Sequence, residues 1–367
     1  MRAHKVPATY FSGWKAAGYN ASFYVFYKNN PNDKGILKSF GAVKNITAEH
    51  SCFMEEDFYY VDFHIKGIAF KLEKEIGEFF DQGLYKIECA DDLADVPEGD
   101  PLPVVIIDDY QKYISYMTNI DSWVIKDSQS NLVAVEDFKN ILDNYIFDKV
   151  GTIIEEDYFA NHLESMWGDV RTSIINDVSG LNTGDKVVIT RKSELLEFFV
   201  VQYLRLDKRI KTDIEPVVKM FEKIFVDMGA DEETLSDMKD DGLLATDAYF
   251  FGVLLDAARG DKKRINHHIS EIDANYVIDV LQAPIGCSYL SSTSPCIFSK
   301  MAGTSKEEML FPLNSQYCLR FRKKKDASTY GQYILQSGDA VKNINNMIIS
   351  ATEDIVVSEN EYITNII

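Results

Sequence analysis

The 367-residue sequence lacks the signatures that identify most common enzyme classes. It contains no GxGxxG or GxxxxGK[ST] phosphate loop, no HExxH zinc motif, no GxSxG nucleophile elbow and no set of protein-kinase motifs. These absences argue against the best-known nucleotide-binding, zinc-dependent and serine-hydrolase chemistries. The sequence therefore predicts neither a metal site nor a cofactor.

Cysteine and long apolar runs are also scarce. The cysteines are odd in number and form no CxxC pair, which argues against a disulfide framework and against structural zinc. We expect buried, reduced thiols at Cys52, Cys89, Cys287, Cys296 and Cys318. No run approaches the roughly 20 apolar residues that span a bilayer, and the first residues show no apolar signal-peptide core. These features predict a cytoplasmic protein without a membrane partner.

Basic residues are outnumbered, with 38 Lys and Arg against 58 Asp and Glu, which gives a net charge of −20. Such a surface repels phosphate backbones over long range, so non-specific nucleic-acid binding is disfavoured. A single pocket can still be basic on a chain of negative net charge. A protein partner or a small anionic ligand therefore remains a possible binding partner. What is abundant is apolar: 46% of residues are hydrophobic and 12% aromatic, enough for a sizeable core.

The order of the expected elements favours an α+β fold over alternating βαβ units. Strand patterns cover 21–28, 59–65, 84–90, 285–290 and 310–321, and helix patterns cover 68–80, 135–147, 155–177, 193–209, 215–229, 248–259, 272–281 and 339–352. For 193–209, whose apolar content is nearly continuous, a strand is the alternative. We expect a strand-rich part (1–130), a helical part (131–283) and a C-terminal strand and helix part (284–367), packed as one integrated domain.

Seven segments resemble a known family when taken in order. They are HKVPATYFSGW, FGAVKNITAEHSCF, IIEEDYFANHLES, LLEFFVVQYLRLDKR, YLSSTSPCIF, MLFPLNSQYCLRF and KNINNMIISATEDIVVS. The ordered set resembles the bacterial family called Domain of Unknown Function 4238, over nearly the whole chain. That family typically has a His-x-Val-Pro start, a Lys-Asn or Arg-Asn pair, a Glu-rich helix, a Gln-x-x-Arg helix and a Ser-Asp-x-Pro strand end. A Pro-Leu strand and an Asn-rich helix follow.

The resemblance maps the family pattern onto His4, Pro7, Lys44, Asn45, Glu155, Glu164, Gln202, Arg205, Pro295, Pro312 and Leu313. One position departs from it, because this chain has Ser292, Thr293 and Ser294 before Pro295, without the aspartate. A polar strand end of this kind can still hydrogen-bond a ligand, so Asn45 and these three residues are predicted to bind one.

A physical argument places a polar cluster around Gln202 and Arg205, which share a helix face three residues apart. Arg205 lies beside a stretch of apolar residues, and a buried guanidinium without an acceptor is costly. Glu155 or Glu164 is the expected acceptor.

His4 and Lys44 would add a base and a cation to this cluster. The set could bind an anion or carry out acid–base chemistry. Alternatively, Arg205 and a glutamate form a structural ion pair between two helices.

Two further histidine and basic patterns have ordinary structural interpretations. His162 lies on the same helix face as Glu155, but no second Glu-x-x-His pair supports a metal site, and we expect a satisfied helix histidine. Adjacent His267 and His268 point in different directions on a helix and cannot share one ion. The basic run from Arg322 to Lys325 is expected to be a solvated hairpin turn.

Three functions are compatible with these observations. The resemblance suggests an effector-type enzyme of a defence or toxin system, hydrolase or nuclease-like. A second hypothesis is a binding or regulatory module in which the same residues brace the fold. A third is an NAD-dependent ADP-ribosyltransferase-like enzyme, because Arg205, the Ser292 to Ser294 run, and Glu359 with Glu361 match its Arg, Ser-Thr-Ser and Glu-x-Glu order.

Overall fold

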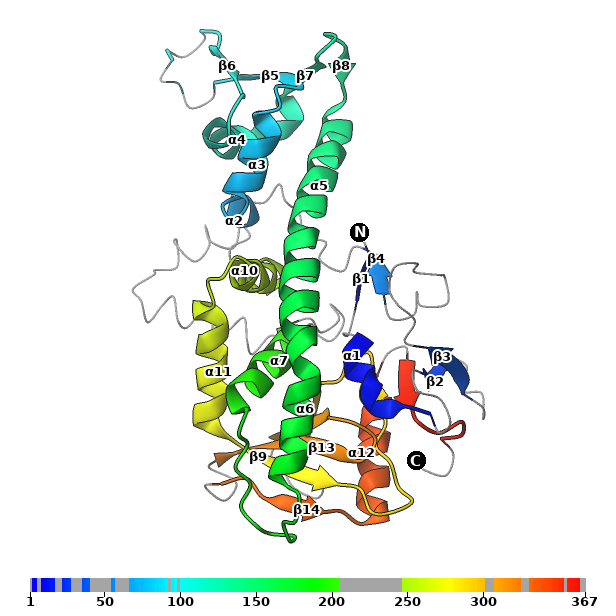
Figure 1. Cartoon of the computed structure of the whole chain (residues 1–367). Coiled ribbons are helices and arrows are strands. Elements are labelled where there is room, and N and C mark those ends of the chain that lie inside the picture. Colours follow the sequence, from blue (N-terminus) through cyan, green and yellow to red (C-terminus); the bar gives the residue numbers. More distant parts are fainter. Residues whose placement is uncertain are drawn as a thin grey trace. The chain divides into compact units, whose positions relative to one another are not determined.

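The computed structural model confirms the α+β class, with strands towards both ends of the chain and helices in its middle (Figure 1). It describes residues 2–4, 8–16, 22–27, 35–39, 54–56, 66–91, 94, 96–97, 100–204, 246–300, 307–324, 330–352 and 355–363. These residues divide into two compact units. Unit 1 takes its residues from 59–154 and 210–255, and unit 2 takes its residues from 2–58, 155–209 and 256–367.

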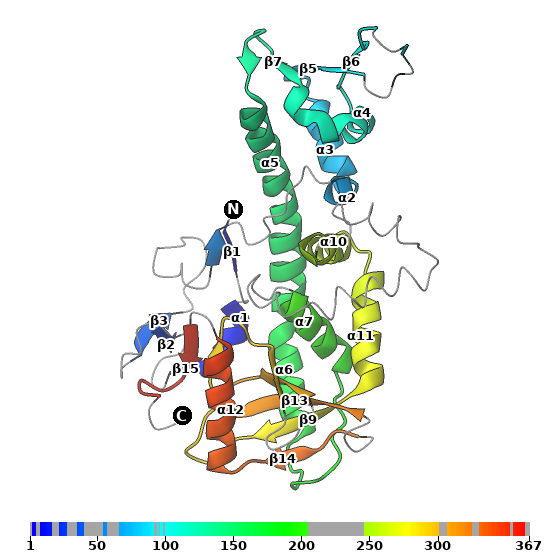
Figure 2. The ribbon, with the colours of Figure 1, turned by 180° about the vertical axis from the view of Figure 1, so that it is seen from behind.

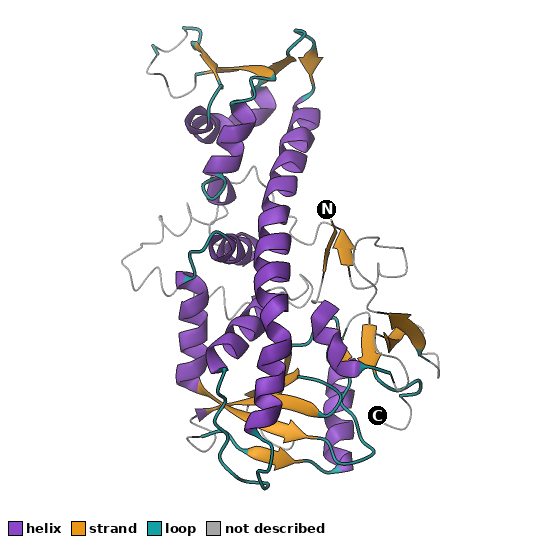
Figure 3. Ribbon diagram, in the orientation of Figure 1, coloured by secondary structure: helices purple, strands orange, loops and turns teal. Residues whose placement is uncertain are grey.

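Unit 1 contains a small antiparallel sheet in the order β6-β5-β7-β8 (Figure 3). Phe79 of α3 (Glu73–Phe80) and Phe138 of α5 (Val135–Gly151) pack against Tyr85 of this sheet. Rings of Phe79, Phe138, Tyr113 and Trp123 contact one another in its core. The strands are β5 (Tyr85–Ala90), β6 (Val104–Ile106), β7 (Val124–Asp127) and β8 (Leu132–Val133). The helices are α2 (Lys66–Ala69), α3 (Glu73–Phe80), α4 (Tyr110–Tyr116), η3 (Met117–Ser122), α5 (Val135–Gly151) and most of α10 (Thr246–Ala258).

Unit 2 is centred on a five-stranded sheet in the order β11-β12-β13-β9-β14, antiparallel except for the β14–β9 pair. Its strands are β9 (Tyr276–Gln282), β11 (Ile297–Lys300), β12 (Glu307–Pro312), β13 (Tyr317–Lys323) and β14 (Tyr333–Leu335). Figures 1 and 2 show α6 (Ser165–Asp177) and α12 (Gly338–Ala351) on opposite sides of this sheet.

Each face of the five-stranded sheet carries its own apolar layer. On one face, Val341, Ile344 and Ile348 of α12 pack in one cluster with Leu281, Leu310 and other sheet residues. On the other, Phe199 of α7 (Lys192–Leu204) stacks on Phe321 with ring centroids 4.4 Å apart. Strand β9 is therefore buried on both faces, from Val277 to Leu281.

The two ends of the chain meet in a second sheet of unit 2, in the order β10-β15-β2-β3. Its strands are β2 (Ser22–Tyr27), β3 (Ile36–Ser39), β10 (Ser291–Ser292) and β15 (Ile355–Ser358), and a separate pair joins β1 (Arg2–His4) to β4 (Met54–Glu56). The first helical turns, α1 (Ala8–Phe11) and η1 (Ser12–Trp14), enter the core, where Tyr10 lies against Trp167 and Phe311.

Buried polar side chains fix the loops around this core. The Asn345 amide is fully buried on α12, and it accepts a hydrogen bond from Leu290 N at 2.9 Å and donates one to Ser288 O at 2.9 Å. The indole of Trp14 donates to Tyr289 O at 2.8 Å. The loop that precedes β10 is therefore held from both the helix and the N-terminal segment.

Several predicted elements are confirmed, among them β2, β5, α7, α10, α12 and the β12–β13 hairpin. Residues 272–281 were predicted as a helix and 285–290 as a strand, and both predictions are wrong. The helix α11 (Lys263–Asn275) ends early and β9 follows, and residues 285–290 pass through a turn at Gly286, whose φ is 84°. The predicted elements at 59–65 and 215–229 lie outside the described residues.

The basic run from Arg322 to Lys325 was predicted to be a solvated hairpin turn, and this prediction is wrong for Arg322. Arg322 lies in strand β13 with its side chain 11% exposed, and its Nε is 2.5 Å from Oδ2 of the fully buried Asp279. Arg320 binds the same carboxylate at 2.8 Å. The two arginines face a strand carboxylate, so sheet pairing accounts for their position.

The expectation of buried thiols is confirmed for Cys89, Cys296 and Cys318, whereas Cys287 is half-buried. Cys52 lies outside the described residues. No helix among the described residues has the length and apolar character that crossing a bilayer requires. The predicted division at 130 and 283 differs from the two compact units, because β15 pairs with β2 across nearly the whole chain length.

Candidate functional site

A nearly buried carboxylate in unit 2 gathers three polar groups around one oxygen atom. Glu197 lies on α7 with its side chain 13% exposed. Its Oε1 is 2.7 Å from Lys262 Nζ, 3.0 Å from His162 Nε2 and 3.1 Å from the Tyr158 hydroxyl, which donates to it. We refer to Tyr158, His162, Glu197 and Lys262 as the Glu197 cluster.

The Glu197 cluster is assembled from three helical segments. Tyr158 and His162 lie on η4 (Thr152–Glu164), a π-helix, and their rings stack with centroids 5.6 Å apart. Lys262 is the residue immediately before α11, and its Nζ is 5.8 Å from the centre of the Tyr158 ring. π-helical turns are rare in proteins, and those that occur are often found at functional sites. The segment that carries His162 is therefore unusual.

The charges of the cluster keep the carboxylate ionised. Burial alone would raise the pKa of Glu197, but the hydrogen bonds and charges of Lys262 and His162 outweigh it and lower that pKa. Burial and the neighbouring carboxylate raise the pKa of Tyr158, so its hydroxyl stays protonated and remains a donor. Glu197 is thus a fixed anion with an ammonium and an imidazole at its edge.

The imidazole of His162 has two ways of using its Nε2 atom. That atom is 3.0 Å from Glu197 Oε1 and 2.9 Å from Lys262 Nζ, and it cannot donate to one and accept from the other at the same time. If Nε2 carries the proton, it donates to Glu197 and the opposite ring nitrogen is free to act as a base. The His162 side chain is 40% exposed, so solvent reaches it.

None of the site residues predicted from the sequence belongs to the Glu197 cluster. Gln202 lies on α7, two per cent exposed, and neither polar atom of its amide has a hydrogen-bond partner within the part of the chain that the structure describes. Glu155 lies half-buried on η4. The backbone of His4 lies in β1, whereas Lys44, Asn45 and Arg205 lie outside the described residues. The predicted contact of Arg205 with a glutamate therefore stays a prediction.

The predicted ligand-binding run is buried at the edge of the second sheet of unit 2. Ser292, Thr293 and Ser294 are 0%, 8% and 6% exposed. The Ser292 hydroxyl donates to Ser294 O at 2.9 Å and accepts from Ser294 N at 3.1 Å. Within the described residues this hydroxyl closes a local turn, which is the structural interpretation of the run. Its binding of a ligand, and with it the transferase hypothesis, stays a prediction.

Sequence reasoning missed Glu197 and Lys262. A signal for Glu197 was present, because it is the acidic residue inside the apolar stretch LLEFFVVQYL. The argument that a charge in an apolar helix needs a partner was applied to Arg205, and it applies equally to Glu197. No signal pointed to Lys262, which lies 65 residues further along the chain.

Comparison with known proteins finds no matching family model, no matching curated protein and no matching solved structure. The resemblance to the family of Domain of Unknown Function 4238 therefore stays a prediction. Among the described residues, no group of three or more His, Cys, Asp and Glu side chains could hold a metal ion. The site is consequently argued from its own geometry.

Proposed function

We propose that this protein is a hydrolase in which His162, oriented by Glu197, is the general base. One observation carries the proposal: the 3.0 Å contact between His162 Nε2 and a carboxylate that is nearly buried, on an imidazole ring that solvent reaches. A carboxylate that binds one ring nitrogen fixes the tautomer and leaves the other nitrogen as a base, as in hydrolase triads. The resemblance to the bacterial family adds the setting, an effector of a defence or toxin system.

The chemistry assigns a role to each member of the Glu197 cluster. His162 takes a proton from water, the hydroxide attacks an electrophilic carbon or phosphorus, and the bond to the leaving group breaks. The leaving group then takes the proton from His162. Lys262 is 33% exposed and stabilises negative charge that develops on the substrate, while Tyr158 holds the Glu197 carboxylate in place.

The test is hydrolysis of p-nitrophenyl acetate and bis(p-nitrophenyl) phosphate by the full chain, a carboxylic ester and a phosphodiester. We expect His162→Gln to lower the rate by about 100-fold or more, because general-base catalysis contributes about that much. The matched control is His267→Gln, which removes an exposed histidine on α11. Equal rates for the wild type and His162→Gln, or no hydrolysis of either compound by the wild type, would contradict the proposal.

A non-catalytic binding module is the second candidate, and the saturation of Glu197 favours it. Three donors on a single carboxylate oxygen also describe a brace that joins η4, α7 and the start of α11. The two candidate functions predict different stabilities and activities for the His162→Gln variant. A brace predicts a loss of stability in a protein that hydrolyses neither compound, whereas the hydrolase predicts an active wild type and a folded, inactive variant.

A further inference from the structure

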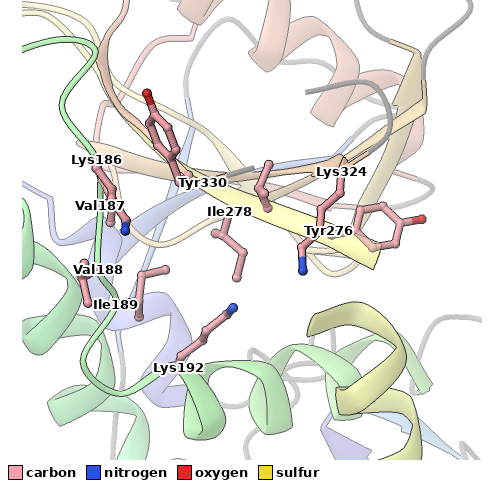
Figure 4. A pocket seen from close by; sticks show the side chains of 11 residues that line it. Lys186, Val187, Val188, Ile189, Lys192, Tyr276, Ile278, Lys324 and Tyr330 are labelled. Carbon is pink, nitrogen blue, oxygen red and sulfur yellow. The ribbon is translucent and has the colours of Figure 1, made fainter. Parts of the chain in front are cut away.

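A cavity in unit 2, separate from the Glu197 cluster, is lined by three lysines. It has a volume of about 330 Å³ and lies between the segment Lys186–Ile189, the first residue of α7 and the start of β9 (Figure 4). The lysines are Lys186, Lys192 and Lys324, and none of the 11 lining residues is acidic. On a chain whose net charge is −20, a cavity of this composition is a local reversal of charge.

Two of the three lysines are held in position by one residue at the end of α11. Lys192 Nζ forms an ion pair with the Asp273 carboxylate, and Lys324 Nζ donates to Asp273 O at 2.8 Å. Figure 4 shows the nitrogen atoms of Lys192 and Lys324 turned into the cavity, while the Tyr276 hydroxyl points away from it. Lys186 lines the same cavity from the segment before α7, and no carboxylate of the described residues forms an ion pair with it.

The charges of the cavity favour a doubly charged anion. Among the described residues, the three lining lysines and the Asp273 carboxylate that pairs with Lys192 together carry a net charge of +2. A phosphate monoester carries about −1.5 to −2 at pH 7, which balances this charge. Lysine ammonium groups bind phosphate as point charges, without the bidentate geometry that arginine would impose.

The remaining walls of the cavity are apolar and suit the rest of a ligand. Val187, Ile189 and Ile278 line it, together with Tyr276 and Tyr330. Its volume lies at the lower end of the range for small-molecule sites, which is about 300 to 1,000 Å³. A long polyanion is disfavoured, because the rest of the surface repels it.

We infer that this cavity binds a small phosphorylated molecule with an apolar or aromatic part, of the nucleoside monophosphate class. The lysines take the phosphate, and the Val187, Ile189 and Ile278 wall takes the ring. This inference is independent of the hydrolase proposal, because no residue of the Glu197 cluster lines the cavity.

The test is isothermal titration of the full chain with AMP, adenosine, inorganic phosphate and poly-glutamate. We expect AMP to bind more tightly than adenosine or phosphate, with an affinity that falls as salt rises. Lys186→Met should weaken AMP by about tenfold, since it removes one charge-assisted contact. Val188→Asp, at a lining residue that is 67% exposed, should weaken AMP further without unfolding the protein.

Lys263→Met is the matched control, because Lys263 lies outside the cavity with its side chain 90% exposed, and it should bind AMP as the wild type does. Three results would overturn the inference. They are equal binding of adenosine and AMP, AMP affinity that is unchanged in Lys186→Met and Val188→Asp, and binding of poly-glutamate in place of AMP. If inorganic phosphate bound as tightly as AMP, the apolar wall would contribute nothing to binding, and its assignment to the ring of the ligand would be wrong.

Discussion

The Glu197 carboxylate shows how a single residue makes stability depend on pH. Its pKa is lowered in the folded protein against burial, by Lys262 and His162. Because the pKa is lowered on folding, the ionised Glu197 stabilises the folded protein, and this contribution is complete above the pKa of an unfolded glutamate, about 4.3. The stabilisation is lost as the pH falls through the folded pKa, which is lower still.

The resulting prediction compares the wild type with Glu197→Gln by urea denaturation between neutral and acid pH. At neutral pH we expect the variant to be less stable by about 1.5 to 3 kcal/mol, the usual range for hydrogen bonds to a charged group. The difference should shrink as the pH falls below about 4.3, because the unfolded glutamate takes up a proton there before the folded one does. Glu194→Gln, on the same helix and 37% exposed, should change little at any pH. A constant difference across the pH range would contradict this account.

Individual site residues could be predicted from the sequence only where their own neighbours along the chain carry the signal. The burial of Gln202 followed from the apolar residues around it on α7, and the structure places it at two per cent exposure. His162 was noted, but its partners Glu197, on α7, and Lys262, immediately before α11, lie elsewhere in the chain. A cluster built from three segments depends on how those segments pack, and spacing within one segment does not contain that information.

At the scale of elements, a close backbone approach ties β9 to the segment before β14. A Cβ atom on Gly331 would lie 1.8 Å from Ile278 O, so the two backbones touch where any side chain would intrude. Gly331 O also accepts from Val187 N at 2.9 Å, which attaches the Lys186–Ile189 segment to the sheet. Glycine is therefore required at this position by the space available to it.

We predict that Gly331→Ala lowers the free energy of unfolding by about 2 to 3 kcal/mol, because the strand must shift to admit the methyl group. The matched control is Gly168→Ala on α6, where a Cβ atom would have no neighbour within 4 Å among the residues that the structure describes. That substitution should stabilise the protein by about 0.5 to 1 kcal/mol, since alanine loses less entropy than glycine in a helix. Chemical denaturation measures both values, and a neutral Gly331→Ala would refute the close approach.

Apolar runs without periodicity mark the limit of element prediction in this chain. Segment 193–209 was predicted as a helix, and the structure confirms α7 over 192–204. Segment 272–281 was also predicted as a helix, yet β9 occupies 276–282. A strand covered by apolar layers on both faces loses the alternation that identifies it. The β-branched residues of YVIDVLQ were the remaining signal for the strand.

At the scale of the whole molecule, the pairing between distant parts of the chain was beyond sequence reasoning. β2 lies near the N-terminal end and pairs with β15, near the C-terminal end, in register from Tyr24 with Ser358 to Tyr27 with Ile355. The composition and element order gave the α+β class, but register depends on contacts over more than 300 residues of chain. The same long-range pairing makes unit 2 discontinuous, with unit 1 drawn from two inserted stretches.

Each unit has its own buried aromatic core, so we expect each to unfold in its own transition. Tryptophan fluorescence can separate the two transitions, because Trp123 lies in unit 1 and Trp14 and Trp167 lie in unit 2. In a Trp123→Phe background, fluorescence reports unit 2 alone. There, Leu319→Ala in β13 should lower the stability by about 2 to 5 kcal/mol, because it leaves a cavity in the core.

Leu142→Ala on α5 is the paired substitution, since Leu142 is as fully buried in unit 1 as Leu319 is in unit 2. In the same background it should change the fluorescence transition by less than about 0.5 kcal/mol, the limit for independent sites. Far-UV circular dichroism should show the lost stability of unit 1 as an earlier first transition. If both substitutions moved the fluorescence midpoint equally, the two units would form a single cooperative structure.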